Sequence, residues 1–331
     1  MKLLKINLTT AIEEIKKRKA KKIILQLPEG LKTKLVSVSQ ELEQKTNAEI
    51  ITSISPIFGA CDLAIEELQK FDADLIVHIG HNEFFKFNKA IYVPLYYNIP
   101  KKSITITAKK LEKVLKQNKF KKIAIAGVVQ YKKALLELKK LLEKKGFIVL
   151  IEKGKRTTEG QVLGCGAGAI NKISKKADCA VFVGDGMFHA QAINFSTNKK
   201  SFKADLLNEK ITELKETDLF LRQRFALIQK AKKAKKFGII ITTKPGQMRY
   251  GNALRLKKII EKKGKTAILL TGNLILPEFL LGINVDCFVS TACPRISIDD
   301  WKNFKKPIIN PIELEILLDE KKWSEFKFEE Y

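Results

Sequence analysis

The amino-acid sequence predicts an α/β protein made of three similar units, each built around a parallel β-sheet. The order strand, helix, strand, helix, strand occurs three times, at intervals of roughly 100 residues, a length that suits one small domain. The expected strands are nearly continuous runs of Ile, Val and Leu, which are typical of parallel strands covered by helices on both faces. A chain of 331 residues also exceeds what one hydrophobic core usually serves, so we expect several domains.

The first unit is expected within residues 1–100. A short apolar run predicts a buried strand, and the turn Pro28-Glu29-Gly30 leads from it into an amphipathic helix. Two further apolar runs predict the remaining strands of this unit. The expected elements are a strand at 21–27, a helix near 31–46, and strands at 48–53 and 73–79.

The second and third units, expected at residues 101–230 and 231–331, repeat this arrangement. The second should contain a strand at 121–127, a helix near 132–145, and strands at 147–151 and 178–184. The third should contain a strand at 237–242, a helix near 251–263, and strands at 266–270 and 285–290. The segment from Pro307 to Tyr331 is expected to be a tail that packs back on the core.

The chain is strongly basic, with 62 Lys and Arg against 36 Asp and Glu and a formal net charge of +26. Most lysines fall at helical positions opposite Leu, Ile and Ala, where a solvated helix face is expected, so contact with nucleic acid is expected only indirectly. No apolar stretch approaches the roughly 20 residues of a spanning helix, and Met1 to Lys5 lead into a charged helix. We therefore expect a cytoplasmic protein without a membrane contact.

Three of the five cysteines, Cys61, Cys165 and Cys293, lie in turn-like stretches of small residues, one in each predicted unit. Each follows a predicted strand, and ligands of open parallel sheets bind beyond the carboxyl ends of the strands. Disulfides are disfavoured in the cytoplasm, so these residues indicate thiols, catalysis or metal binding. Cys179 and Cys287 lie in apolar strands instead and are expected to fill the core.

Three thiolates without a nearby histidine suit a four-iron cluster with one open iron better than a structural zinc site, which usually has four protein ligands. No CxxC pair is present. Spacing alone therefore leaves three interpretations open, namely a shared three-thiolate site, unlinked structural thiols and a zinc site.

Arginine is scarce, with seven residues among the 62 basic ones, so an arginine in a loop suggests a need for its planar, bidentate donors. Arg249 and Arg295 lie in such loops and are candidates to bind a carboxylate or a phosphate. His78 and His81 lie at the end of a predicted strand. Such a pair could hold a metal, although a structural role near a site is more common.

Several strings together resemble the diphthamide synthase family, the 2-(3-amino-3-carboxypropyl)histidine synthases, over essentially the whole chain and in order. The strings are Gln26-Leu27-Pro28-Glu29-Gly30-Leu31, Gly59-Ala60-Cys61-Asp62, His78-Ile79-Gly80-His81, Leu163-Gly164-Cys165, Gly246-Gln247 and Thr291-Ala292-Cys293-Pro294-Arg295.

The resemblance implies that Cys61, Cys165 and Cys293 hold a [4Fe-4S] cluster at a central site between the three units. It further implies cleavage of S-adenosylmethionine to a 3-amino-3-carboxypropyl radical, which adds to a histidine of translation elongation factor 2 and leaves methylthioadenosine. Arg295, Arg249, Gln247 and His81 are the expected cofactor-binding residues. A homodimer of the archaeal type is expected, and the electron donor is not indicated.

Two other functions stay open at this stage. Quinolinate synthase also brings one cysteine from each of three α/β domains to a four-iron cluster, but it uses the cluster as a Lewis acid for dehydration. A basic, non-catalytic protein associated with RNA or the ribosome would instead have dispensable cysteines and an affinity for RNA that depends strongly on salt.

Overall fold

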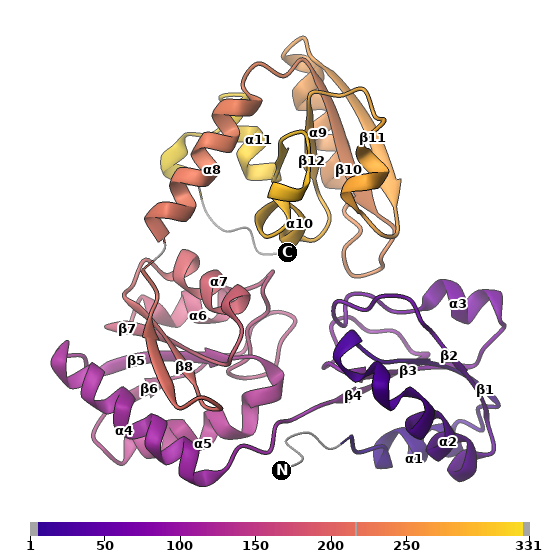
Figure 1. Cartoon of the computed structure of the whole chain (residues 1–331), viewed down its shortest axis with the longest axis vertical. Coiled ribbons are helices and arrows are strands. Elements are labelled where there is room, and N and C mark those ends of the chain that lie inside the picture. The colour runs from indigo at the N-terminus through magenta and orange to yellow at the C-terminus, as the bar shows by residue number, and fades with distance from the viewer. Residues whose placement is uncertain (1–5, 216, 327–331) are drawn as a thin grey trace. The chain divides into compact units, whose positions relative to one another are not determined.

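The computed structural model describes residues 6–215 and 217–326 of the chain (Figure 1). These residues divide into two compact units, with the division between Leu214 and Lys215. Within them the first unit contains two β-sheets and the second contains one. The predicted fold class, three similar α/β domains with parallel sheets, is therefore confirmed. No helix in the described part of the chain is long and apolar enough to span a membrane.

The first sheet has four parallel strands in the order β2-β1-β3-β4. Its elements are α1 (Thr9–Lys17), β1 (Lys22–Gln26), the 3-10 helix η1 (Glu29–Lys34), α2 (Leu35–Thr46), β2 (Glu49–Thr52), α3 (Ile65–Lys70), β3 (Leu75–Gly80) and β4 (Ala90–Pro94). Successive residues of a strand point to opposite faces of the sheet. Ile23 and Leu25 accordingly pack with α1 and α2, whereas Ile24 packs with α3 on the other face.

The second sheet has five strands in the order β6-β5-β7-β8-β9, of which only β9 is antiparallel to its neighbour. Its elements are α4 (Lys101–Gln117), β5 (Lys122–Gly127), η2 (Val129–Tyr131), α5 (Lys132–Glu143), β6 (Ile148–Leu150), α6 (Gly168–Ser174), β7 (Cys179–Val183), α7 (Met187–Thr197), β8 (Ser201–Asp205) and β9 (Lys210–Glu213). Ile123 and Ile125 pack with α4 and α5, and Ala124 and Ala126 pack with α6 and α7. Helices thus cover both faces of this sheet.

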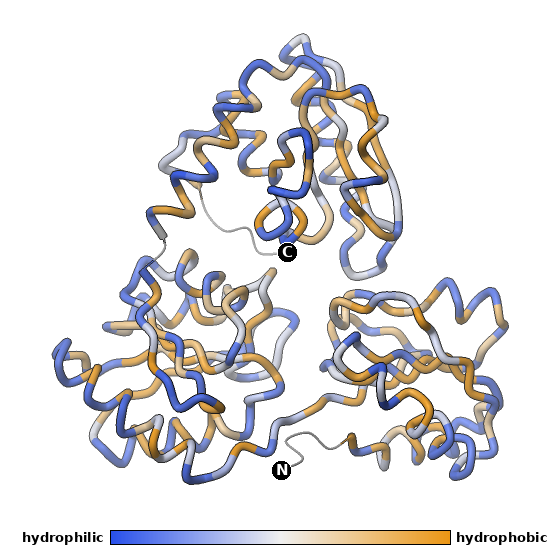
Figure 2. The backbone as a smooth tube through the Cα atoms, in the orientation of Figure 1, coloured by the Kyte–Doolittle hydropathy of each residue, from blue (hydrophilic) through white to orange (hydrophobic). Residues whose placement is uncertain are grey.

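The third sheet has four parallel strands in the order β11-β10-β12-β13. Its elements are α8 (Thr217–Ala231), β10 (Lys236–Thr242), α9 (Tyr250–Lys262), β11 (Thr266–Gly272), η3 (Pro277–Leu280), β12 (Cys287–Ser290), α10 (Pro294–Ile298), η4 (Trp301–Asn303), β13 (Ile308–Ile309), α11 (Pro311–Leu317) and η5 (Trp323–Glu325). Ile239 and Ile241 pack with α8, α9 and α11, whereas Ile240 packs with η3. In Figure 2 the strands are mostly hydrophobic, while the covering helices alternate between hydrophobic and hydrophilic residues.

The same carboxylate contact recurs at the amino-terminal edge of all three sheets. In the first sheet, Asp74 Oδ2 accepts hydrogen bonds from the backbone N–H groups of Lys21 and Lys22, at 2.7 and 2.9 Å. Asp178 and Asp286, which also directly precede the third strand of their sheets, make the same contact at 2.7 to 2.8 Å. The three domains therefore repeat one design at the level of single hydrogen bonds.

Two features differ from the sequence-based expectation. Helix α8 lies before the expected boundary at residue 231, yet it packs in the third core through Leu227 and Ile228, so the third domain begins earlier. The segment from Pro307 is more than a tail, because Ile308 and Ile309 form strand β13 and helix α11 packs beside α8. Residues 327–331 of that segment, like residues 1–5, lie outside the described residues.

Candidate functional site

All three candidate cysteines lie in loops beyond the carboxyl ends of the strands. Cys61 lies between β2 and α3, Cys165 lies between β6 and α6, and Cys293 lies between β12 and α10. Each of the three is partly exposed. Cys179 and Cys287 are fully buried inside strands, and burial raises the pKa of the Cys179 thiol to about 12 and that of Cys287 as well. The prediction that these two fill the core is confirmed.

Gln26, a buried residue at the end of β1, forms hydrogen bonds with the loop that carries Cys61. Gln26 Nε2 donates to the carbonyl oxygen of Asp62 at 3.2 Å, and Gln26 Oε1 accepts from the backbone N–H of Ala64 at 3.0 Å. Because both amide atoms of Gln26 are committed to the backbone on either side of Leu63, the segment after Cys61 has a fixed conformation.

His78 and His81 lie beside Gln26, at the end of β3. His78 is fully buried, with Nδ1 at 3.3 Å from Gln26 Oε1 and Nε2 at 2.9 Å from Nδ1 of His81. The ring of Tyr92, from β4, packs against His78 with 5.6 Å between the ring centroids. Burial raises the pKa of Tyr92, and the nearby Glu83 and Cys61 raise it further, which places Cys61 in the same neighbourhood.

Burial also lowers the pKa of both histidines, of His78 to about 3 and of His81 to about 4. The cost of removing an imidazolium from water favours the neutral ring. Both rings are therefore neutral at physiological pH, and each carries one N–H donor and one acceptor nitrogen.

Cys165 lies in a tight backbone turn that is packed against helix α7. Leu163 and Gly166 exchange two backbone hydrogen bonds, of 3.0 and 3.1 Å, and enclose Gly164 and Cys165. A Cβ atom on Gly164 would lie 1.6 Å from the ring of Phe188, in the first turn of α7. Only glycine leaves room for this ring, so the Leu163-Gly164-Cys165 string has a steric explanation.

A polar network within the first unit joins the loop after β3 to the segment that precedes Cys165. Asn82 Nδ2 donates to Oε1 of the buried Gln161 at 2.9 Å, and Gln130 Nε2 donates to the carbonyl oxygen of Gly80 at 3.2 Å. The guanidinium of Arg156 lies over the ring of Phe84, at 5.0 Å from its centroid. The first two domains therefore fix each other at the edge where Cys61 and Cys165 lie.

In the third domain, the candidate residues lie at the exits of two adjacent strands, β10 and β12. The hydroxyl of Thr291 donates to the carbonyl oxygen of Ile240 at 2.9 Å, which holds the turn before Cys293 against β10. Gln247 and Lys244 are buried in the loop after β10, where the backbone N–H of Gln247 donates to the carbonyl oxygen of Lys244 at 3.0 Å. This edge thus combines a thiol with buried polar groups.

The two candidate arginines differ in their surroundings. Arg249 is half-buried at the start of α9. Arg295 is exposed in the first turn of α10, and its Nε lies 2.9 Å from a carboxylate oxygen of Asp299. Arg295 would have to exchange this partner for the carboxylate of a ligand.

The structure groups the predicted site residues by unit. Cys61, Cys165 and His81 belong to the first unit, and Cys293, Arg249, Arg295 and Gln247 belong to the second. Within the described residues no cluster of three or more His, Cys, Asp or Glu side chains is close enough to hold a metal ion. The meeting of the three thiols at one cluster therefore stays a prediction.

Sequence reasoning assigned no role to several residues of these edges. The missed residues are Gln26, Asn82, Tyr92, Gln161 and Lys244. Gln26 follows the apolar run Ile23-Ile24-Leu25, and a polar residue at the end of an apolar strand is a signal that could have identified it. The Asn82 to Gln161 bond joins residues 79 positions apart, so it had no local signal.

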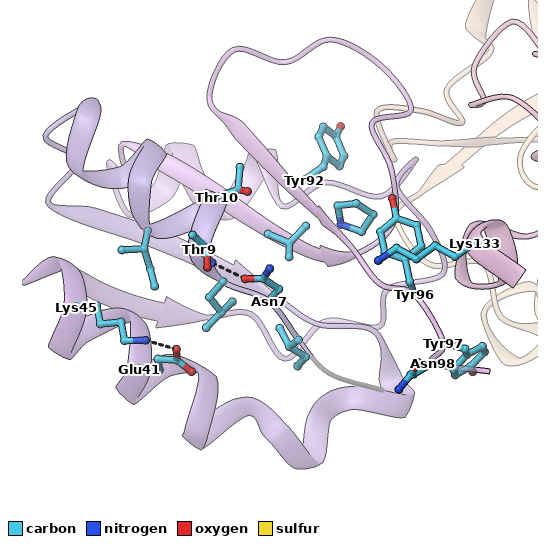
Figure 3. Close-up of a pocket in the computed structure, with 15 residues that line it drawn as sticks. Asn7, Thr9, Thr10, Glu41, Lys45, Tyr92, Tyr96, Tyr97, Asn98 and Lys133 are labelled. Atoms are coloured by element: carbon cyan, nitrogen blue, oxygen red, sulfur yellow. Dashed lines mark hydrogen bonds and ion pairs between the residues drawn. The ribbon is translucent and has the colours of Figure 1, made fainter. Parts of the chain in front are cut away.

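A cavity of about 850 Å³ lies elsewhere on the first unit, between α1, α2 and the segment after β4 (Figure 3). Lys133 Nζ lies over the ring of Tyr96, at 5.1 Å from the centroid, and Lys45 pairs with Glu41 at 2.6 Å. None of the predicted site residues lines this cavity. Tyr92, whose ring packs against His78, is among the residues that line it.

The chain is similar to known proteins of one family over nearly its whole length. A sequence model of the diphthamide synthesis proteins matches residues 27–328. The chain is 32% identical to the 2-(3-amino-3-carboxypropyl)histidine synthase of Pyrococcus horikoshii over 324 residues, which cover 96% of this chain and 91% of that protein. It is 31% identical to the synthase of the same name from Methanocaldococcus jannaschii, with 96% and 90% covered.

A solved structure is similar as well. The crystal structure of Dph2 from Pyrococcus horikoshii with a 4Fe-4S cluster superposes with a TM-score of 0.90 at 31% identity, and the match covers 99% of this chain and 94% of that chain.

Proposed function

Because the chain belongs to the diphthamide synthesis protein family, we propose that it is a 2-(3-amino-3-carboxypropyl)histidine synthase. In this reaction the 3-amino-3-carboxypropyl group of S-adenosylmethionine is transferred to a histidine ring of translation elongation factor 2, the first step of diphthamide biosynthesis. The observation that carries the proposal is the placement of one partly exposed cysteine at the same edge of each of three equivalent sheets. The names of the relatives support it.

Cys61, Cys165 and Cys293 have the chemistry that a [4Fe-4S] cluster with one open iron requires. All three lie on loops and are partly exposed, whereas the other two cysteines are buried and held as thiols by burial. The similar Dph2 structure contains a 4Fe-4S cluster. When bound, such a cluster supplies the electron that cleaves the bond from the sulfonium sulfur to the methionine γ-carbon, giving the 3-amino-3-carboxypropyl radical and methylthioadenosine.

The protein's own residues would bind and orient S-adenosylmethionine. Arg249 and Arg295 can donate two parallel N–H bonds to its carboxylate, and Gln247 can donate or accept. His81 is neutral and can accept a hydrogen bond. The carboxylate must be held firmly, because a reactive carbon that is misplaced by about 1 Å lowers the rate by about 100-fold.

We further propose that the protein acts as a cytoplasmic homodimer and receives its electron from a separate reductant. The archaeal relatives are named simply as the synthase, whereas the relative from Saccharomyces cerevisiae is named subunit 1. A chain that carries all three candidate cysteines needs no second kind of subunit to supply a ligand, which suits a homodimer. The net charge of +26 would favour encounter with an acidic surface of the protein substrate.

The test of the reaction uses anaerobically purified protein, dithionite, S-adenosylmethionine and elongation factor 2. We expect a mass gain on one histidine of the factor and an equal amount of methylthioadenosine. Absence of both from protein with a filled cluster would overturn the proposal. Dehydration of an organic acid without cleavage of S-adenosylmethionine would favour the Lewis-acid chemistry of quinolinate synthase.

The cysteine variants test which residues hold the cluster. Cys61→Ala, Cys165→Ala and Cys293→Ala should each lose most of the bound iron and sulfide and the visible absorption of the cluster. The matched controls Cys179→Ala and Cys287→Ala should retain both, since their side chains are buried within strands. Full iron content in any of the first three would remove that residue from the ligand set.

A further inference from the structure

The hydrogen bonds around Gln26 determine which way its amide is oriented. Oε1 faces the backbone N–H of Ala64 at 3.0 Å, and Nε2 faces the carbonyl oxygen of Asp62 at 3.2 Å. The flipped orientation would place two donors against each other at Ala64 and two acceptors against each other at Asp62. Gln26 is buried, so no water can compensate for such a mismatch. Oε1 is therefore the atom that faces His78.

This orientation determines the tautomer of His78. Its Nδ1 lies 3.3 Å from Gln26 Oε1, which can only accept, so Nδ1 carries the proton. Burial lowers the pKa of His78 and keeps the ring neutral. Its Nε2 therefore has a lone pair and accepts a hydrogen bond from His81 Nδ1 at 2.9 Å.

The same reasoning then extends to His81. Its Nδ1 must carry the proton that it donates to His78, and its own lowered pKa keeps the ring neutral. Nε2 of His81 is thus an acceptor. His81 is only partly buried, and Nε2 makes no hydrogen bond within the described residues, so this lone pair can accept from a ligand.

We propose that Gln26 and His78 are positioning residues that hold His81 as the Nδ1–H tautomer, so that its Nε2 binds the ammonium group of S-adenosylmethionine. The ligand follows from the proposed function, whose substrate has one ammonium and one carboxylate. The opposite tautomer would direct an N–H at the ammonium and repel it. A neutral imidazole nitrogen with a lone pair suits the ammonium, because it accepts a hydrogen bond without adding a like charge.

The tautomers can be measured directly by long-range ¹H–¹⁵N correlation of the imidazole rings. Only three histidines are present, so His81→Asn and His189→Asn assign the spectrum. We expect the Nδ1–H tautomer for both His78 and His81. In Gln26→Leu, Nδ1 of His78 has no acceptor, so a substantial fraction of both rings should change to the Nε2–H tautomer. A native His81 in the Nε2–H form would overturn the proposal.

His78→Phe is a second variant, for use if Gln26→Leu does not fold. It removes the acceptor of His81 Nδ1 without altering Gln26, and His81 should then show a mixture of both tautomers. A His81 that keeps the pure Nδ1–H form in this variant would show that His78 does not determine it. Circular dichroism and thermal melting check that each variant is folded.

Binding measurements test the ligand. We expect native protein to bind S-adenosylmethionine about tenfold more tightly than its analogue without the amino group, as expected for one hydrogen bond to a charged group. Gln26→Leu should lose most of this preference. Equal affinity of native protein for the two compounds would overturn the ammonium assignment alone. A complete lack of binding of S-adenosylmethionine would instead overturn the proposed function, while the tautomer measurement would still stand on its own.

Discussion

Arg224 and Glu313 form a fully buried ion pair inside the third domain. Arg224 donates from Nε and Nη2 to the two carboxylate oxygens, each at 2.6 Å, and from Nη1 to the carbonyl oxygen of Ser297 at 2.6 Å. Ser297 lies in α10, the short helix that begins directly after Cys293. The pair therefore connects α8 and α11 to the segment behind the third candidate cysteine.

We expect Arg224→Met to lower the free energy of unfolding of the third domain by about 3–5 kcal/mol, since the carboxylate of Glu313 would stay buried without its cation. Arg255→Met is the matched control. Arg255 pairs with Glu315 but is half-exposed, and Lys321 also contacts that carboxylate, so its loss should cost less than about 1 kcal/mol. Urea unfolding measures both variants, and equal costs would contradict this argument.

At the scale of single residues, sequence predicted some roles and missed others for physical reasons. The sequence distinguished Cys179 and Cys287 from the loop cysteines because apolar residues follow these two in the chain, which is local information. Arg224 is one of only seven arginines, but its partner lies 89 positions away, so nothing local distinguished it from a surface arginine. Contacts between distant residues are what the sequence pattern does not contain.

At the scale of elements, the turn that carries Cys165 depends on the absence of a side chain at residue 164. Gly164→Ala would place a Cβ atom 1.6 Å from the ring of Phe188, so the ring or the turn must shift. We expect a loss of about 1–3 kcal/mol in stability, the usual cost of overpacking, and faster reaction of the Cys165 thiol with a disulfide reagent.

Gly186→Ala is the matched control for this substitution, since a Cβ atom at that position meets no other atom within 4 Å and its φ is −72°. Its stability and thiol reactivity should match those of the native protein. Unchanged Cys165 reactivity in Gly164→Ala would mean that Phe188 does not hold the turn.

The elements that sequence predicted best are the buried central strands, and the strands it missed are those that follow the third strand of each sheet along the chain. Two examples are the apolar runs from Ile23 to Leu25 and from Ile239 to Ile241. Their composition predicts a buried strand, and all of these residues are buried. The missed strands are β4, β8, β9 and β13, which lie outside these central runs, and β13 has only two residues. Such strands exist because a neighbouring strand pairs with them, and the sequence does not encode that pairing locally.

At the scale of the whole molecule, repetition was predictable because it is a property of the sequence pattern. Three copies of one strand and helix order predicted three sheets, and each sheet has its first strand between its second and third. How far the cysteine loops lie from one another depends on contacts between domains, such as the bond from Asn82 to Gln161. The pattern of apolar residues contains no information about such contacts.

The three repeated aspartates predict how the whole molecule responds to acid. In the folded chain, two backbone N–H groups hydrogen bond to each of Asp74, Asp178 and Asp286 and lower its pKa below 3.8. A carboxyl group whose pKa is lower in the folded chain than in the unfolded chain stabilises the fold at pH values above its unfolded pKa. That stability is lost as the pH falls through about 3.8 toward the lower folded pKa, because the unfolded chain then binds more protons.

We therefore expect the triple variant Asp74→Asn, Asp178→Asn, Asp286→Asn to lose less unfolding free energy than the native protein between neutral pH and pH about 3. At neutral pH it should be the less stable of the two, because a neutral amide accepts these hydrogen bonds more weakly than a carboxylate. Asp72→Asn is the control, since Asp72 accepts no such pair of backbone bonds. Urea unfolding at several pH values measures the slope of stability with pH. Parallel slopes for the native protein and the triple variant would show that these carboxylates do not contribute to acid unfolding.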